Sequence, residues 1–345
     1  MTTPASVKAV PVSDVGERGL IERIRRRLPP SPPQLLVGIG DDAAVAAPDR
    51  GALNVLTTDV LVEGVHFDRR FSAMSDVGYK AVAVNLSDVA AMGGVPRFVL
   101  LSLLLPASTT IADLDDLIDG LLVAAAPAAV AVAGGNLSRS PGPLVVDVTL
   151  VGSVGPRKVL RRDGGRPGDA LYVTGSVGGA AAGLAWLRAN ATTPRMSPAD
   201  QALAECVARY RRPAPRTRVG TLLGRTRSAG ACIDLSDGLA DAVRQLAEAS
   251  GAGARIDAAS LPIHPGVPIW CSGVGQDAVD LAVAGGDDYE LLFAVPPKRR
   301  SRLRAAARLF RGVPVTEIGE LTADRALVIA RGDHVAELPV GYVHF

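Results

Sequence analysis

The chain has 345 residues, of which 48% are hydrophobic, 21% charged and 4% aromatic. This length predicts two domains of roughly 150 residues each, and the apolar fraction excludes a disordered chain. The 37 basic and 35 acidic residues give a net charge of +2, so the overall charge carries no footprint for nucleic acid.

The first half alternates strand-like apolar runs with helical segments, and we expect a tail over residues 1–12 followed by a domain over 13–155. Helices are predicted at Gly19–Leu28, 76–92 and 110–126, bounded by Pro29, Gly93 with Gly94, and Thr109 with Thr110. Strands are predicted at Leu53–Leu56, Phe98–Leu105 and Leu144–Val151. On the helix over 76–92, Lys80 is expected to be exposed or to face a partner.

The second half, residues 156–345, is expected to form another domain after the basic, glycine-rich segment 157–168. Its predicted strands are Ala170–Thr174, Gly230–Leu235, 280–284, 290–295 and 315–330. Its predicted helices are Gly178–Arg188 and Gly238–Ser250, and residues 190–216 are expected to be rich in loops. The alternation of strands and helices in both halves predicts an α+β or α/β class with two domains.

No segment is predicted to cross a membrane or to direct export. The longest apolar run, Leu121–Ala133, is interrupted by Pro127 and is shorter than the roughly 20 residues that a bilayer helix needs. The N-terminal segment lacks the apolar core of a signal peptide. The three cysteines, Cys206, Cys232 and Cys271, lie too far apart in sequence to indicate a zinc or disulfide motif. We therefore expect a cytoplasmic protein.

Acidic residues recur beside glycine and hydroxyl residues, where we expect turns near apolar runs. The segments are Gly40-Asp41-Asp42, Thr57-Thr58-Asp59, Asn85-Leu86-Ser87-Asp88, Asp234-Leu235-Ser236-Asp237-Gly238 and Gly285-Gly286-Asp287-Asp288. If these carboxylates meet in one cleft, their repulsion favours a hard cation such as Mg²⁺, which prefers oxygen ligands. The alternative is ordinary turn and helix-cap chemistry, which the same residue types also favour.

The motifs of several other enzyme classes are absent. The sequence has no P-loop, no Gly-x-Ser-x-Gly elbow and no His-Glu-x-x-His. The histidines are scattered at His66, His264, His334 and His344, which argues against zinc and against a Ser-His-Asp triad. The glycine-rich segment Gly175–Gly179 is typical of either a phosphate cradle or close helix packing. Metal-assisted phosphoryl transfer fits this inventory best, because it relies on positioning and charge neutralisation.

A series of motifs runs in order through nearly the whole chain. They are Gly16-Glu17, Leu20-Ile21, Gly38–Asp42, Thr57–Phe67, Gly78–Gly93, Gly134–Asn136, Arg162–Gly164, Pro213–Arg216, Asp234–Gly238, Gly285–Leu291 and Gly341–Phe345. Together they resemble the thiamine-monophosphate kinase family of the PurM-like (aminoimidazole ribonucleotide synthetase-like) ATP-binding superfamily. The resemblance implies a two-domain α+β fold in which the N-terminal mixed sheets of two subunits pair into a barrel, forming a homodimer.

The resemblance also implies an activity and a site. The expected reaction transfers the γ-phosphate of ATP directly to thiamine monophosphate, giving thiamine diphosphate and ADP in the last step of thiamine diphosphate biosynthesis. The implied ligands of several Mg²⁺ ions are Asp42, Thr57, Thr58, Asp59, Asp88, Asn136, Asp234 and Asp237. The implied ATP contacts are Gly135, Asn136, Arg162 and Ser236, and the implied thiamine pocket is His66, Asp287 and Tyr342. No nucleic-acid or membrane partner is expected.

The sequence departs from the family pattern at three places. Asn136 stands where many members have Asp, which removes a negative charge and predicts weaker cation binding, although some members also have Asn there. Tyr210 replaces the usual His before the Pro213–Arg216 motif, and Asp287 replaces the commoner Glu with a shorter side chain.

Two alternatives are disfavoured by the sequence. Other PurM-like enzymes carry a reactive Cys or selenocysteine with a Lys near the N-terminus, or end in Cys, whereas the first Cys here is Cys206 and the chain ends in Phe345. A binding protein that has lost its chemistry is suggested only by Asn136. It would bind ATP without turnover.

Overall fold

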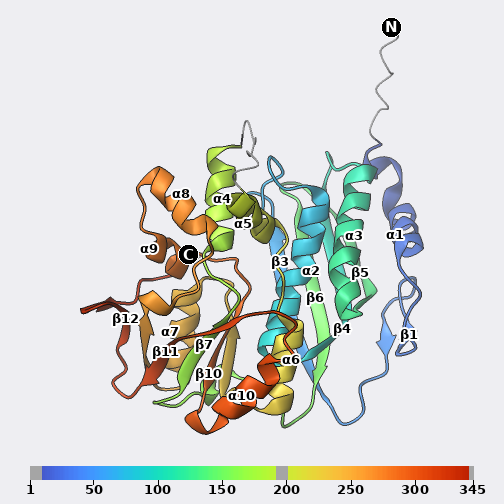
Figure 1. The fold of residues 1–345 in the computed structure, drawn as a ribbon. Helices are drawn as coiled ribbons and strands as arrows, with labels where there is room; N and C mark the ends of the chain where they lie inside the picture. The colour runs from blue at the N-terminus through green and yellow to red at the C-terminus, as the bar shows by residue number, and fades with distance from the viewer. Residues whose placement is uncertain (1–9, 192–200, 342–345) are drawn as a thin grey trace. The chain divides into compact units, whose positions relative to one another are not determined.

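The computed structural model describes residues 10–191 and 201–341, and they form two compact units (Figure 1). The first unit contains the described residues up to Pro48, together with 57–85 and 97–151. The second contains 49–56, 86–96 and everything described from Gly152 onward. The division expected between residues 155 and 156 stays a prediction, but two short earlier segments pack with the second unit.

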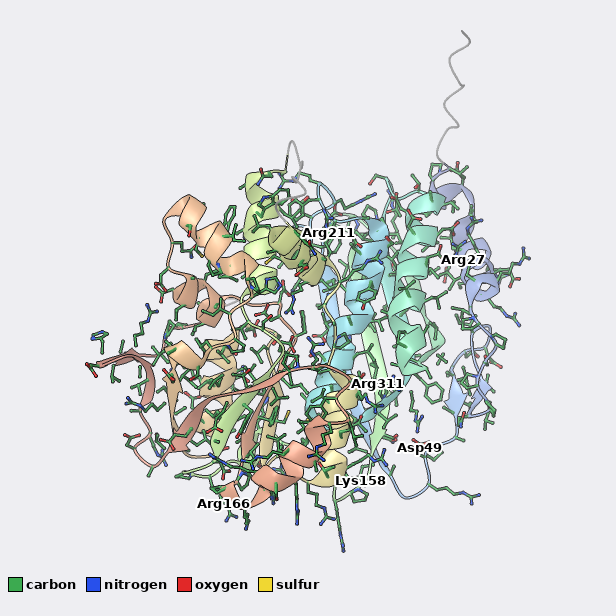
Figure 2. All side chains as sticks on the ribbon, in the orientation of Figure 1. Arg27, Asp49, Lys158, Arg166, Arg211 and Arg311 are labelled. Carbon is green, nitrogen blue, oxygen red and sulfur yellow. The ribbon has the colours of Figure 1, made fainter. Side chains whose placement is uncertain are left out.

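The N-terminal half is built on a four-stranded sheet in the order β3-β6-β4-β5, in which β4 and β5 are parallel. Its elements are α1 (Gly16–Arg27), β1 (Leu35–Val37), β2 (Val45–Ala46), β3 (Leu53–Val62), α2 (Met74–Ala91), β4 (Val95–Pro106), α3 (Ile111–Ala125), β5 (Ala131–Ser140) and β6 (Val145–Val154). Thr110, one of the two threonines predicted to open this helix, caps α3 reciprocally with Asp113. On the surface, Arg27 of α1 (Figure 2) pairs with Asp119 of α3 at 2.5 Å.

Two glycines let α2 and α3 pack backbone to backbone. A Cβ atom on Gly78 would lie 1.9 Å from the carbonyl oxygen of Leu117, and one on Gly120 would lie 1.8 Å from that of Ser75. The expectation that Lys80 is exposed is wrong, because its side chain is buried. Helix α2 is enclosed on several sides from Lys80 to Ser87, so it has no solvent face there.

The second unit holds a seven-stranded sheet in the order β13-β12-β9-β11-β7-β10-β8, antiparallel except for the pair β12–β9. Its strands are β7 (Ala170–Thr174), β8 (Ala231–Asp234), β9 (Gly253–Asp257), β10 (Leu291–Val295), β11 (Val315–Thr322), β12 (Leu327–Arg331) and β13 (His334–Glu337). Its helices are α4 (Gly179–Ala189), α5 (Gln201–Arg211), α6 (Thr217–Thr226), α7 (Leu239–Ala249), α8 (Gly266–Val274), α9 (Ala278–Ala284) and α10 (Arg300–Ala307).

Strand β10 is apolar throughout because both faces of its sheet are covered. Leu292 and Ala294 pack in one core with residues of α7, whereas Leu291, Phe293 and Val295 pack in another with residues of α6 and α10. A strand covered on both faces shows no polar alternation. The largely antiparallel sheet, with helices on each face, confirms the two-domain α+β class. Within the described ranges, no helix has the length and apolar character needed to span a membrane.

Three expectations about the second half are wrong. The strand expected at 280–284 is helix α9, which begins after Asp277, whose side chain accepts a hydrogen bond from the N–H of Asp280. A short apolar run cannot by itself distinguish helix from strand, and here the cap decides. Within the segment expected to be loop-rich, Gln201–Arg211 forms α5. The strand expected at 315–330 is two strands, β11 and β12.

Candidate active site

The loop after β8 carries the acidic and hydroxyl residues that the sequence assigns to metal and ATP. Asp234 is the last residue of the strand and is buried, with 5% of its surface exposed. Its Oδ2 accepts a hydrogen bond of 2.7 Å from the hydroxyl of Ser87, a buried residue in the second half of α2. Ser236 is exposed and Asp237 half-buried, and Gly238, not Asp237, is the N-cap residue of α7. The loop therefore presents carboxylate and hydroxyl oxygens together.

A second loop, residues 285–290, runs directly beside the first. The N–H of Asp287 donates to the carbonyl of Ser236 at 2.7 Å, and the N–H of Tyr289 donates to that of Leu235 at 2.9 Å. The contact requires glycine at 286, since a Cβ there would lie 2.6 Å from the Ser236 oxygen. These bonds bring the predicted substrate residue Asp287 next to the loop that carries Asp234 and Asp237.

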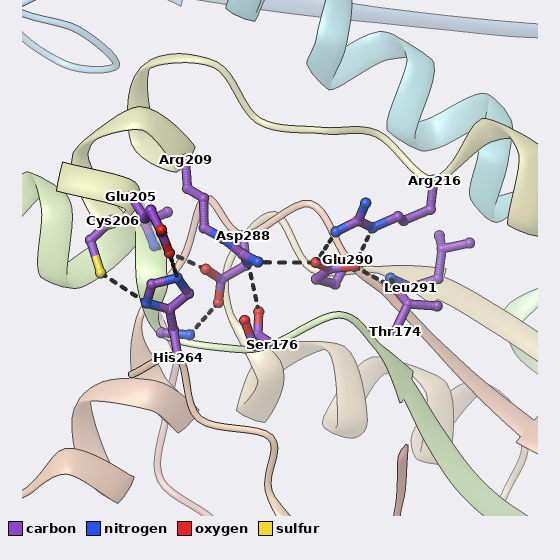
Figure 3. A network of polar contacts seen from close by, with 12 residues as sticks. Thr174, Ser176, Glu205, Cys206, Arg209, Arg216, His264, Asp288, Glu290 and Leu291 are labelled. Atoms are coloured by element: carbon purple, nitrogen blue, oxygen red, sulfur yellow. Dashed lines mark hydrogen bonds and ion pairs between the residues drawn. The ribbon is translucent and has the colours of Figure 1, made fainter. Parts of the chain in front are cut away.

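Two buried carboxylates hold the 285–290 loop (Figure 3). Asp288 accepts hydrogen bonds from the N–H groups of Gly178 at 2.5 Å and Ala180 at 3.0 Å, at the start of α4. Burial raises the pKa of Asp288 to about 7, an effect that the two N–H donors partly oppose. Gly178 and Ala180 thus already serve an internal carboxylate, and a Cβ on Gly178 would lie 2.7 Å from Ala282. This geometry favours the packing interpretation of Gly175–Gly179.

Glu290 is completely buried and neutralised by arginine. Its carboxylate forms a two-pronged ion pair with Arg216, in which Nε lies 2.5 Å from Oε2, and Nη1 of Arg209 lies 3.6 Å from Oε1. Thr174 donates its hydroxyl to the same carboxylate at 2.6 Å. A planar guanidinium facing a carboxylate in this way gives both charge and geometric specificity.

In the first unit, the predicted ligands of β3 do not form a turn. Thr57, Thr58 and Asp59 lie inside the strand, where successive side chains point to opposite faces. Thr58 donates to Asp147 of the neighbouring β6 at 3.0 Å and lies 3.1 Å from the hydroxyl of Thr149. Thr57 and Asp59 point to the other face, so the three side chains cannot surround one ion in this arrangement. This limit applies to side chains only, so the backbone carbonyl oxygen of Thr58 could still bind the same ion as one of them.

The other predicted residues of the first unit lie in loops and on β5. Asp42 is exposed in a bend before β2, and its N–H donates to the Asp41 carboxylate at 2.9 Å. His66 is half-buried after β3, and its Nδ1 accepts the N–H of Val62 at 3.1 Å. Gly135 and Asn136 are exposed on β5, and a Cβ on Gly135 would lie 1.9 Å from the Leu101 oxygen. Close strand pairing thus requires glycine there.

Two of the remaining predicted residues, Asp88 and Arg162, belong to the second unit. Asn85–Asp88 lies within α2 and is not a turn, because the helix continues to Ala91 before Gly93 takes a positive φ. Asp88 is half-buried on that helix. Arg162 is exposed and donates to Gln245 of α7 at 2.5 Å. Tyr342 lies outside the described residues.

The oxygen chemistry of the site suits a hard cation. Across residues 10–191 and 201–341, no three His, Cys, Asp or Glu side chains form a group able to hold a metal ion. The predicted donors are carboxylate, hydroxyl and amide oxygens, the ligand class that Mg²⁺ prefers. Asp234, buried and held by the Ser87 hydroxyl, is the most constrained of them.

The sequence alone assigned no role to four residues that shape this site: Arg216, Asp288, Tyr289 and Glu290. One sequence feature could have indicated them. Asp288 and Glu290 alternate just before an apolar strand, so both carboxylates are expected to be near a hydrophobic core. Buried carboxylates need partners, and Arg216 closes a predicted Pro-rich motif.

Comparison with known proteins gives one consistent result. The family description "AIR synthase related protein, N-terminal domain" matches residues 40–154, and "AIR synthase related protein, C-terminal domain" matches 166–331. The thiamine-monophosphate kinase of Bacillus subtilis is 35% identical over 312 residues, covering 90% of this chain and 93% of its own.

Solved structures agree. The thiamine-monophosphate kinase of Stenotrophomonas maltophilia has a TM-score of 0.79 at 36% identity, covering 90% of this chain and 95% of its own. AaThiL complexed with AMPPCP and TMP has a TM-score of 0.75 at 32% identity, covering 97% of this chain and 98% of its own.

Proposed function

We propose that this chain, which belongs to the thiamine-monophosphate kinase family, transfers the γ-phosphate of ATP to thiamine monophosphate, giving thiamine diphosphate and ADP. The Bacillus subtilis relative with this name matches over 93% of its own length, and AaThiL is complexed with AMPPCP and TMP. AMPPCP is an analogue of ATP. The pairing of an ATP analogue with a phosphate-bearing acceptor supports direct transfer between the two substrates.

One observation in this chain carries the proposal. The N–H of Asp287 donates to the carbonyl of Ser236, so a loop assigned to the thiamine moiety runs against a loop assigned to ATP and metal. Direct transfer requires the donor and acceptor phosphates to be held close and in line. Two acidic loops fixed to each other by backbone hydrogen bonds would support that alignment.

The chemistry needs positioning more than proton transfer. The acceptor is a phosphate oxygen that is already ionised near neutral pH, so no side chain has to act as a general base. We assign Asp42, Thr57, Thr58, Asp59, Asp88, Asn136, Asp234 and Asp237 to holding several Mg²⁺ ions, not a single one. When bound, Mg²⁺ supplies the positive charge that neutralises the phosphates.

The substrate contacts are assigned in the same way. Gly135, Asn136, Arg162 and Ser236 would contact ATP, with the Arg162 guanidinium adding positive charge near the transferred group. His66, Asp287 and Tyr342 would bind the thiamine moiety. An aromatic ring suits the cationic thiazolium, and a carboxylate accepts hydrogen bonds from the aminopyrimidine.

The active form proposed here is a homodimer. Large apolar side chains remain exposed on the strands of the four-stranded sheet, with Val60, Leu100 and Leu104 at 45%, 38% and 36%. A second copy of the chain would bury them. We also propose a cytoplasmic location, since the three cysteines are free and buried.

Product analysis tests the proposed reaction. The purified protein is mixed with ATP, Mg²⁺ and thiamine monophosphate, and the products are separated by chromatography. Thiamine diphosphate and ADP in equal amounts are expected. Formation of AMP instead of ADP would indicate pyrophosphoryl transfer, and ATP binding without turnover would indicate a different acceptor.

A further inference from the structure

The 285–290 loop has an unusual backbone for residues other than glycine. Asp287 has φ of 70° and Tyr289 has φ of 49°, and they are two of the six non-glycine residues with positive φ in the described part of the chain. The left-handed conformation is unfavourable for such residues, because it brings Cβ close to the following carbonyl oxygen. Two of them separated by one residue persist only where the surrounding contacts impose the conformation.

Those contacts come from the residues that alternate with them. Asp288 is fastened to the N–H groups that begin α4, and Glu290 to Arg216 and Thr174. Space for the Glu290 carboxylate exists because residue 175 is glycine, since a Cβ there would lie 1.9 Å from Oε1. The two buried side chains thus fix the positions on either side of Tyr289.

The left-handed turn lets the side chains of Asp287 and Tyr289 meet. The Tyr289 hydroxyl donates to Oδ1 of Asp287 at 3.1 Å, and Tyr289 is a buried residue with 8% of its surface exposed. A buried ring has little rotational freedom, so its hydroxyl gives the Asp287 carboxylate a fixed reference. Half-buried Asp287 is the member of the pair that is assigned to the substrate.

We propose that Tyr289 is a positioning residue, which orients the Asp287 carboxylate toward the aminopyrimidine of thiamine monophosphate, on a loop shaped by the buried anchors Asp288 and Glu290. This inference rests on the proposed function, which assigns Asp287 to binding thiamine monophosphate. In this proposal the Tyr289 hydroxyl affects the substrate through Asp287. Its loss should therefore affect thiamine monophosphate and leave ATP unaffected.

A double-mutant cycle tests this coupling. The variants are Tyr289→Phe, Asp287→Ala and the double variant, and kcat/KM is measured for thiamine monophosphate, with KM for ATP measured alongside. Tyr172→Phe is the matched control, because the Tyr172 hydroxyl bonds the exposed Glu317 elsewhere in the same unit. Urea unfolding of each variant separates folding defects from binding defects.

Tyr289→Phe is expected to lower kcat/KM for thiamine monophosphate about tenfold or more, as for a lost hydrogen bond to a charged group. In the Asp287→Ala background the same change should have less than about a twofold effect. An equal loss in both backgrounds, or an equal rise in KM for ATP, would overturn the positioning role. If Asp287→Ala alone leaves kcat/KM for thiamine monophosphate unchanged, the fault lies instead in the substrate assignment of the proposed function.

Discussion

The N–H of Asp287 donates to the carbonyl oxygen of Ser236 at 2.7 Å, and this bond joins the two acidic loops of the second unit. The two loops are remote in sequence; one follows β8, the edge strand of the seven-stranded sheet, and the other precedes β10, which pairs with β8. The β8–β10 pairing places Asp234 opposite Leu291, so the end of the first loop's strand lies beside the start of the second loop's strand. The pairing of β8 with β10 therefore helps to set the positions of both loops.

Asp59→Asn is expected to lower kcat at least 100-fold at low Mg²⁺, with partial recovery at high Mg²⁺. The substitution removes a charge from an assigned ligand while keeping its shape. The measurement is a Mg²⁺ titration of activity, with Asp324→Asn, in an exposed loop, as the control that should behave like the parent. Full activity of Asp59→Asn at low Mg²⁺ would remove Asp59 from the metal assignment.

Glu290→Gln is expected to destabilise the fold by about 3–5 kcal/mol, because it leaves the guanidinium of Arg216 buried without a counter-charge. The control is Glu317→Gln, which breaks a surface pair with Arg300 and should cost less than about 1 kcal/mol. Urea unfolding at neutral pH measures both. Equal, small losses would show that the buried pair does not anchor the loop.

The stability of the second unit should fall as the solution is made less acidic. Asp288 has a folded pKa of about 7, whereas an unfolded aspartate titrates near about 3.9. Between these values the folded state holds more protons than the unfolded state, so the free energy of unfolding decreases from about pH 4 to about pH 7 and then levels off.

Asp288→Asn isolates this effect, because asparagine does not titrate. The difference in unfolding free energy, parent minus variant, should fall between pH 5 and pH 8 when measured by urea unfolding. A difference that stays constant across this range would mean that Asp288 does not titrate there.

The association of two copies is tested on the exposed sheet face. Leu104→Arg places a charge where an apolar side chain is 36% exposed on β4. Sedimentation equilibrium at micromolar concentration should give a dimer for the parent and a monomer for the variant. A parent that sediments as a monomer would contradict the homodimer proposal.

Local signals predicted much of the fold. Thr110 correctly marks the start of α3, and the apolar run Ala170–Thr174 is strand β7. The signals failed where a short run fits two structures, as in α9, and where a strand passes through polar residues, as at Thr57-Thr58-Asp59. In β3 the strand continues because pairing in the sheet outweighs the polar character of its residues.

The anchors of the site could not be predicted, because their partners are remote in sequence. Glu290 meets Arg216 across 74 positions, and Asp288 meets Gly178 across 110. Nothing near Asp288 or Glu290 in sequence indicates which cation or helix start will neutralise them. Only the folded second unit brings these groups together.

Direct transfer of the γ-phosphate to thiamine monophosphate is tested most directly by a single-turnover reaction. The enzyme is in excess over ATP radiolabelled in its γ-phosphate, and thiamine monophosphate is present. Direct transfer predicts that the label appears in the terminal phosphate of thiamine diphosphate at the rate at which ADP forms. Label released as inorganic phosphate, with thiamine monophosphate unchanged, would contradict the claim.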